Sequence, residues 1–139
     1  MHPLWIAVGL SAAACGKTVH MYDGEPRDPA EVSRISCGVP DGEFVHVDGR
    51  FAHYADCVEV PPGQHTFEIA VGLYDSFRDR QGERRSRFVF VTEAGHDYRI
   101  RKAQDWLARP RSAVEDTTTD TDVTHRFEPR GLAEPLPAR

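Results

Sequence analysis

The chain has 139 residues, of which 40% are hydrophobic and 28% are charged. This length and balance are ordinary for one globular domain with a modest core. The formal net charge of -5 disfavours nucleic acid as the main partner, because nucleic acids attract basic surfaces. No apolar stretch of the sequence reaches the roughly 18 to 20 residues that a membrane-spanning helix needs.

The first segment, PLWIAVGLSAAAC at residues 3–15, is apolar and too short to span a membrane. It has the length of a signal-peptide hydrophobic region and ends in small residues, as signal peptidase requires. It resembles a bacterial lipoprotein signal, in which small residues precede a cysteine that becomes lipidated; here Ala12, Ala13 and Ala14 precede Cys15. The resemblance implies a signal peptide over residues 1–14 and a lipid on Cys15. An ordinary secretory signal, a buried element of a cytosolic domain and a translation start at Met21 are the alternatives.

The three cysteines of the sequence allow a simple assignment. An odd number in an exported protein leaves one thiol without a partner. If Cys15 carries lipid, Cys37 and Cys57 are left to form a disulfide in an oxidising periplasm. Closing a loop of that length would stabilise the fold by about 3 kcal/mol, through the lost entropy of the unfolded chain. The alternative is that Cys37 and Cys57 are two buried free thiols.

After the signal segment, residues 15–30 are polar and contain Gly and Pro, which predicts a tether. Residues 31–127 then have the periodicity of β-strands. From His65 to Leu73, every second residue is large or apolar, as in a strand with one buried face. Other short runs are rich in β-branched and aromatic residues. The predicted strands are 31–37, 43–47, 57–60, 65–73, 86–91 and 97–101.

Turn signals separate these strands. Asp48–Gly49 favours a tight hairpin turn, Pro61–Gly63 favours a type II turn, and residues 93–97 join two more strands. Residues 102–110 form at most one helical turn, a hairpin around TTTDT (117–121) follows, and residues 128–139 are a predicted disordered tail. This spacing predicts an all-β fold, a single antiparallel β-sandwich over residues 31–127.

Three motifs carry a resemblance to a known family: VDG at 47–49, VEVPPGQHTFEIAV at 58–71 and FVFVTEAGHDYRI at 88–100. Over residues 18–127 the chain resembles small proteobacterial lipoproteins related to PEGA-type domains. The resemblance implies an immunoglobulin-like or transthyretin-like sandwich in the cell envelope. It carries over no catalytic residue, because members generally lack an assigned activity.

The segment RDRQGERRSR (78–87) is the best candidate for a binding surface. Five arginines on an extended loop suit anionic lipid headgroups or phosphates, because guanidinium groups bind such groups in a bidentate manner. Interleaved acidic residues also allow a plain solvated loop. The five arginines are Arg78, Arg80, Arg84, Arg85 and Arg87.

Histidines and aspartates form a second candidate. His46, Asp48 and His53 lie close in sequence, and imidazole and carboxylate are zinc ligands, but their spacing matches no known metal motif. Structural histidines are therefore the favoured interpretation, and no metal or other cofactor is expected. The DTTTDTD segment (116–122) is interpreted as a solvated turn, because it lacks the Gly and Glu of a calcium loop.

These observations predict a non-catalytic envelope lipoprotein that acts as a binding or scaffolding module. The sequence has no Gly-x-Ser-x-Gly, phosphate-loop or His-Glu-x-x-His motif, which disfavours a hydrolytic enzyme. The expected partners are a membrane, through the N-terminal lipid, and an envelope protein or an anionic lipid or glycan. Gly16 after Cys15 favours the outer membrane, facing the periplasm, under the enteric sorting rule. The alternative function is periplasmic metal or small-ligand binding through His46, Asp48 and His53.

Overall fold

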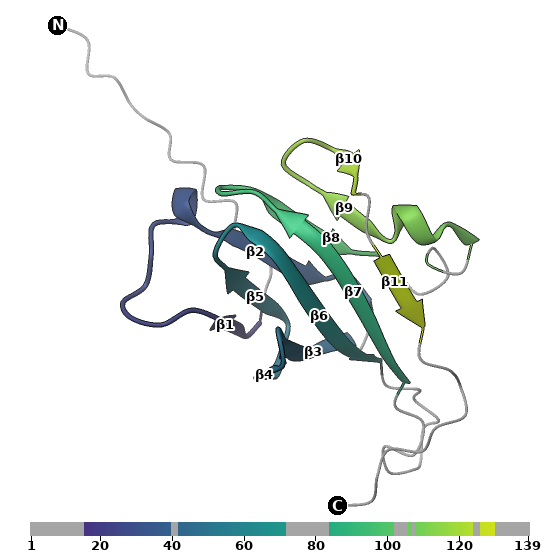
Figure 1. The fold of residues 1–139 in the computed structure, drawn as a ribbon, viewed down its shortest axis with the longest axis horizontal. Helices are drawn as coiled ribbons and strands as arrows, with labels where there is room; N and C mark the ends of the chain where they lie inside the picture. Colours follow the sequence, from purple (N-terminus) through teal and green to yellow (C-terminus); the bar gives the residue numbers. More distant parts are fainter. Residues whose placement is uncertain are drawn as a thin grey trace, which may run out of the picture.

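Two β-sheets packed face to face make up the protein in a computed structural model (Figure 1). The structure describes residues 16–39, 42–71, 84–101, 106, 108–123 and 126–129. The predicted all-β sandwich is therefore confirmed. The predicted signal peptide of residues 1–14 and the lipidation residue Cys15 lie outside the described residues, as do positions 130–139 of the predicted tail.

The first sheet has six strands in the spatial order β1-β5-β2-β8-β9-β10. Their bounds are β1 (Thr18–His20), β5 (Cys57–Val60), β2 (Ser33–Cys37), β8 (Asp97–Ile100), β9 (Val114–Asp116) and β10 (Thr121–Asp122). The second sheet has five strands in the order β11-β7-β6-β3-β4. Their bounds are β11 (Arg126–Pro129), β7 (Arg84–Thr92), β6 (Gly63–Val71), β3 (Gly42–Val47) and β4 (Arg50–Ala55). Two short 3-10 helices, η1 (Pro29–Glu31) and η2 (Pro110–Ser112), complete the described elements.

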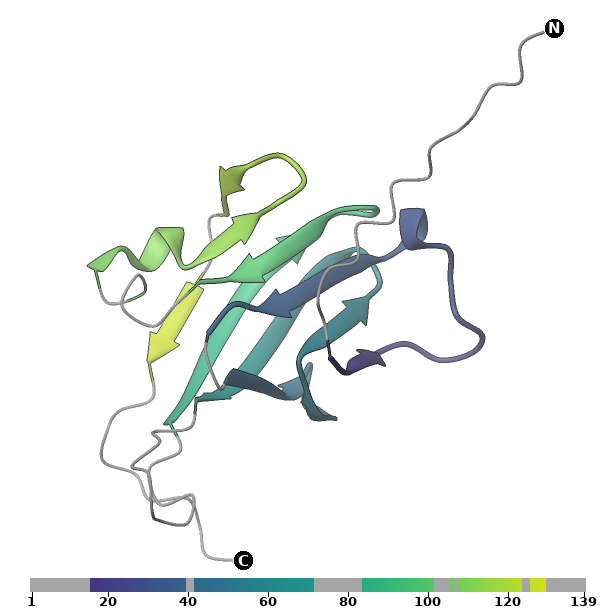
Figure 2. The same ribbon diagram turned by 180° about the vertical axis from the view of Figure 1, so that it is seen from behind.

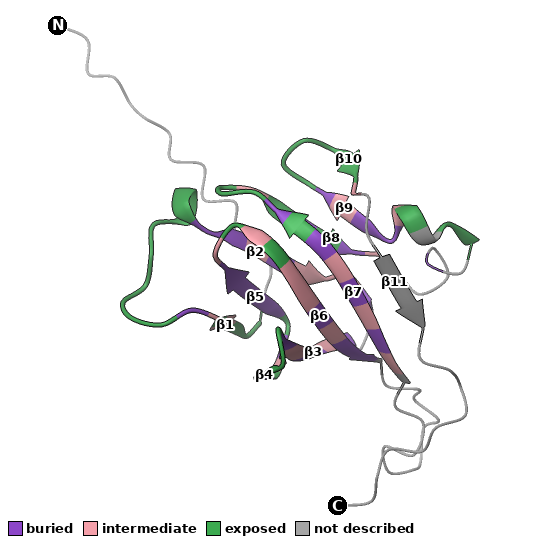
Figure 3. Ribbon diagram, viewed as in Figure 1, coloured by how far each residue is buried: buried purple, intermediate pink, exposed green. Residues whose placement is uncertain are grey.

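Alternation of buried and partly exposed residues along β7 and part of β6 builds the core. Phe67 and Ile69 of β6 and Phe88 of β7 are fully buried, while Glu68 and Arg87 point to the other face. Buried and partly exposed bands alternate along β7 and part of β6 in Figure 3. Because successive side chains of a strand point to opposite faces, this pattern places one face of the sheet against its partner sheet.

The predicted hairpin turn at Asp48–Gly49 is confirmed and joins β3 to β4. Asp48 and Gly49 have φ angles of 50° and 80°, as a primed turn requires. The turn is held from outside as well, because Asp48 Oδ1 accepts a hydrogen bond of 2.8 Å from the backbone N–H of Thr66. Strand β4 itself was not predicted. His53 and Tyr54 both have positive φ there, which distorts the strand and removes its regular alternation.

The first sheet is mixed, whereas the sequence predicted antiparallel pairing alone. Strand β1 pairs in parallel with β5, and β2 pairs in parallel with β8. The reason is that residues 61–62 and 93–96 carry the chain from one sheet to the other, from β5 to β6 and from β7 to β8. These turns are therefore sheet-to-sheet connections and not hairpins. Figure 2 shows β2 and β8 side by side from behind.

The predicted tether contributes to the folded sandwich. Strand β1 lies at an edge of the first sheet, and Val19 packs against the core. Tyr22 is only 8% exposed, and its hydroxyl interacts with the Glu59 carboxylate and the His20 ring. A short polar segment was interpreted as a linker because a three-residue edge strand has too little alternation to be recognised.

The predicted Cys37–Cys57 disulfide is wrong, because Cys37 is a free cysteine. In the pairing of β2 with β5, the residue opposite Cys57 is Ser36. A one-residue offset sends the two sulfur atoms to opposite faces of the sheet. Cys37 packs against the core, and Cys57 is buried on the outer face. Cys57 is disulfide-bonded, to a partner other than Cys37.

Cys37 should be a slow nucleophile in the folded protein. Burial raises the pKa of its thiol to about 11 from 9.0, which lowers the thiolate fraction near neutral pH by about 100-fold. We expect iodoacetamide at about pH 8 to modify Cys37 slowly in the native protein and rapidly in guanidinium chloride. Mass spectrometry of the peptide that contains Cys37 measures both rates. Equal rates in the two conditions would contradict the partly buried position of Cys37 against the core.

Candidate functional site

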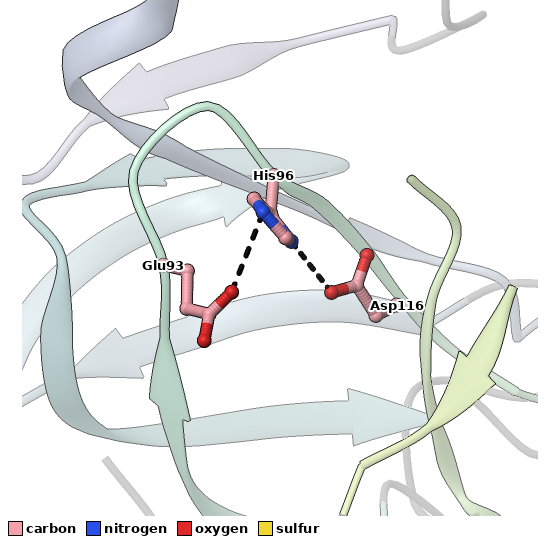
Figure 4. Close-up of side chains that lie close together, drawn as sticks. All are labelled: Glu93, His96 and Asp116. Carbon is pink, nitrogen blue, oxygen red and sulfur yellow. Dashed lines mark hydrogen bonds and ion pairs between the residues drawn. The ribbon is translucent and has the colours of Figure 1, made fainter. Parts of the chain in front are cut away.

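One histidine and two carboxylates converge at the end of the sandwich where β7 turns into β8. Figure 4 shows the His96 ring between the side chains of Glu93 and Asp116. His96 Nδ1 lies 2.7 Å from Asp116 Oδ2, and His96 Nε2 lies 3.3 Å from Glu93 Oε2. Within the described ranges, this is the one group of three or more such side chains whose ligand atoms lie within 4.8 Å of one another.

The backbone fixes each member of this cluster. Gly95 has a φ of 76°, which allows the tight turn between Glu93 and His96. Asp116 lies opposite Tyr98 in the pairing of β8 with β9. The Tyr98 hydroxyl in turn accepts a hydrogen bond of 2.8 Å from the backbone N–H of Glu93. The turn and the end of β9 are therefore held in place by the core.

The charges of His96 and Asp116 stabilise each other. The hydrogen bond to Asp116 is the main cause that raises the pKa of His96 above 6.5. Burial by itself would raise the pKa of Asp116. The hydrogen bonds from His96 and from the backbone N–H groups of Thr119 and Thr118 outweigh that effect and hold this pKa below 3.8. The raised pKa shifts the ring towards the imidazolium form, in which Nδ1 donates a hydrogen bond to Asp116 and Nε2 lies at ion-pair distance from Glu93.

This geometry suits an ionic clamp better than a metal centre. One imidazole nitrogen binds a metal, and Nδ1 is directed to Asp116, which leaves Nε2 and Glu93 as direct ligands. Zinc sites use at least three protein ligands, and a carboxylate on the second nitrogen normally only orients the ring. The raised pKa of His96 also opposes metal binding, which needs a neutral imidazole. The cluster therefore joins the β7–β8 turn to β9.

The ligand set of the alternative function, His46, Asp48 and His53, is not brought together. His46 Nδ1 contacts Glu68 Oε1 at 3.2 Å, and Asp48 Oδ2 contacts His65 Nδ1 at 2.6 Å. The His53 ring packs on Phe51, with ring centroids 4.7 Å apart. Each predicted ligand thus has its own neighbour, and the three do not form one site.

The predicted arginine loop is divided between two regions. Arg78 and Arg80 lie outside the described residues, whereas Arg84, Arg85 and Arg87 belong to strand β7. The loop prediction over 84–87 was wrong because the alternation of β7 extends back to Arg84. Arg85 and Arg87 lie beside a surface hollow of about 320 Å³ on the outer face of the second sheet. The hollow is lined by His46, Gly49, Thr66, Glu68, Arg85 and Arg87.

Sequence reasoning missed the pairing of His96 with Asp116. Asp116 was assigned to a solvated turn, but it is only 6% exposed. The available signal was local: Asp followed by three threonines is typical of an Asx turn, in which the aspartate caps the following N–H groups. Nothing local showed that this turn meets a histidine twenty residues away.

No protein-family model matches the chain, and comparisons with curated proteins and with solved structures find no similar protein. The resemblance to PEGA-related lipoproteins therefore stays a prediction. Over the described part of the chain, no helix combines the length and the apolar character needed to cross a bilayer.

The His96–Asp116 pair should make stability depend on pH in a defined window. A raised histidine pKa stabilises the fold below about pH 6.5, and this contribution is lost as pH rises through the folded-state pKa. A lowered aspartate pKa stabilises above 3.8, and this contribution is lost as pH falls through the folded-state pKa. His96→Gln should therefore destabilise the protein more at about pH 5.5 than at about pH 9, measured by urea unfolding.

His53→Gln is the matched control, because the exposed His53 ring has no carboxylate contact among the described residues. Its effect on the free energy of unfolding should differ little between the two pH values. A His96→Gln effect that is equally independent of pH would contradict the charged clamp.

Proposed function

We propose that this protein is a non-catalytic lipoprotein of the bacterial envelope. Its sandwich would be a binding module that faces the periplasm, held at the outer membrane by lipid on Cys15. The N-terminal segment supports this proposal, because it resembles a lipoprotein signal. The all-β sandwich supports it too, since this is the fold that the resemblance to PEGA-related lipoproteins implies.

The condition of the sheet edges decides which surface serves for binding. An exposed edge strand can pair with a partner strand, but short or bulged edges prevent such pairing. Edge strands β1 and β10 have three and two residues, and β4 is distorted at His53 and Tyr54. Edge strand β11 has four residues and ends at Pro129. The face of β7 that carries Arg85 and Arg87 is therefore the better binding surface, and the hollow beside these arginines is the observation that carries the proposal.

The cysteines connect this proposal to export. The disulfide of Cys57 supports export to an oxidising compartment such as the periplasm, but it does not support the lipid on Cys15. With Cys37 free, Cys15 is the one other cysteine of the sequence. A sulfur that carries a thioether-linked lipid cannot also form a disulfide. A lipidated Cys15 and a Cys15–Cys57 disulfide are therefore mutually exclusive products of the same export route.

The intact mass of the chain tests the proposal. The chain is expressed with its own N-terminal segment in a bacterial host, and the membrane fraction is analysed. We expect a triacylated protein that begins at Cys15, and its loss in the matched variant Cys15→Ser. A cleaved chain that carries no lipid, and whose mass is lower by two hydrogens, would overturn the anchor and assign the Cys15–Cys57 disulfide. An uncleaved soluble chain would overturn export altogether.

A further inference from the structure

The hollow on the outer face of the second sheet is formed by three adjacent strands. Its side chains come from β3, β6 and β7, where Glu68 lies opposite both His46 and Arg87 in the two strand pairings. The volume of about 320 Å³ is at the small end of ligand sites, which fits a small ligand or one group of a larger ligand.

The residues that line the hollow include two arginines and one carboxylate. The Glu68 carboxylate is already engaged, because its Oε1 atom accepts from Arg85 Nη1 at 3.1 Å and contacts His46 Nδ1 at 3.2 Å. Arg87 makes no hydrogen bond or ion pair with any residue that the structure describes, and its Nε atom is buried without a partner. The Nε atom of Arg85 is buried and unpartnered as well. An arginine cannot release its charge, so Arg87 remains a cation without an ion-pair partner among the side chains that the structure describes.

We propose that this hollow binds the phosphate group of a small phosphorylated ligand, with Arg87 as the main contact. Guanidinium groups match phosphate oxygens in a bidentate manner, and such charge-assisted bonds are about twice as strong as neutral ones. Arg85 and Thr66 also line the hollow, and both side chains carry hydrogen-bond donors. Three groups of donors suit a tetrahedral phosphate better than a planar carboxylate, which has two oxygens.

The surroundings of the hollow provide room for the remainder of the ligand. Phe51 is 43% exposed and lies against His46, with ring centroids 6.1 Å apart. It offers apolar surface next to the polar site. The inference deepens the binding role proposed above, but it does not depend on the lipid anchor.

The site is tested by titrating inorganic phosphate into the purified protein. Isothermal titration calorimetry in a constant chloride background measures the binding. We expect saturable binding that Arg87→Gln weakens at least about tenfold, because a charge-assisted contact is lost. Glu68→Gln should strengthen binding, because it removes a negative charge and releases Arg85. The matched control is Arg99→Gln, an exposed arginine on β8 of the other sheet, and it should bind as the unchanged protein does.

Arg87→Gln breaks no observed hydrogen bond, and an unchanged thermal unfolding profile verifies that it folds. The absence of saturable binding, or an equal loss in Arg87→Gln and Arg99→Gln, would overturn the proposal.

Glycerol phosphate and vesicles containing phosphatidic acid then identify the source of the phosphate. Tighter binding of the former assigns a soluble ligand, and tighter binding of the latter assigns a lipid headgroup. Failure of phosphate binding would leave the mass of the anchored protein unchanged, so the two proposals fail separately.

Discussion

The structure depends on one continuous stack of aromatic side chains that crosses from sheet to sheet. Phe67 packs edge-on against Phe44 at a centroid distance of 6.2 Å and stacks on Phe90 at 4.8 Å. Phe90 then contacts Tyr98 of the first sheet at 5.6 Å. Such rings bury large apolar areas and gain further from their mutual orientation. The same Tyr98 binds the backbone N–H of Glu93 through its hydroxyl, so the core directly fixes the position of the His96 clamp.

The parts of the fold that were predictable are those whose signal is local. Alternation from His65 to Leu73 predicted β6, and the Asp48–Gly49 pair predicted the turn between β3 and β4. The parallel pairing of β2 with β8 was not predictable in this way. It results from connections that pass from one sheet to the other. The sequence of a turn such as Glu93–His96 does not show whether the turn closes a hairpin or crosses the sandwich. Strand identity is local information, but the order of strands in a sheet is not.

The candidate sites, too, were predictable only where the signal is local in the sequence. The arginine-rich segment was recognised from composition, yet the useful distinction is the alternation within β7, which sends Ser86 to the core and Arg85 and Arg87 outward. That distinction required knowing where β7 begins. Glu68 determines which of these arginines has a partner. It lies opposite Arg87 in the pairing of β6 with β7, but its carboxylate contacts Arg85. Neither the pairing with Arg87 nor the contact with Arg85 can be inferred from the arginine segment alone.

Strand β1 changes what a lipid anchor on Cys15 would mean for this protein. The backbone N–H groups of Asp56 and Cys57 both donate to the carbonyl of Lys17, and Lys17 Nζ donates to the carbonyl of His53. The chain is therefore attached to the sandwich from Lys17 onward. The three steps from Cys15 to Thr18 span at most about 10 Å, because an extended residue covers about 3.3–3.6 Å. An anchor there would hold the β1 edge directly at the bilayer surface, without the long tether that the sequence predicted. The module would then meet ligands that lie at or near the membrane.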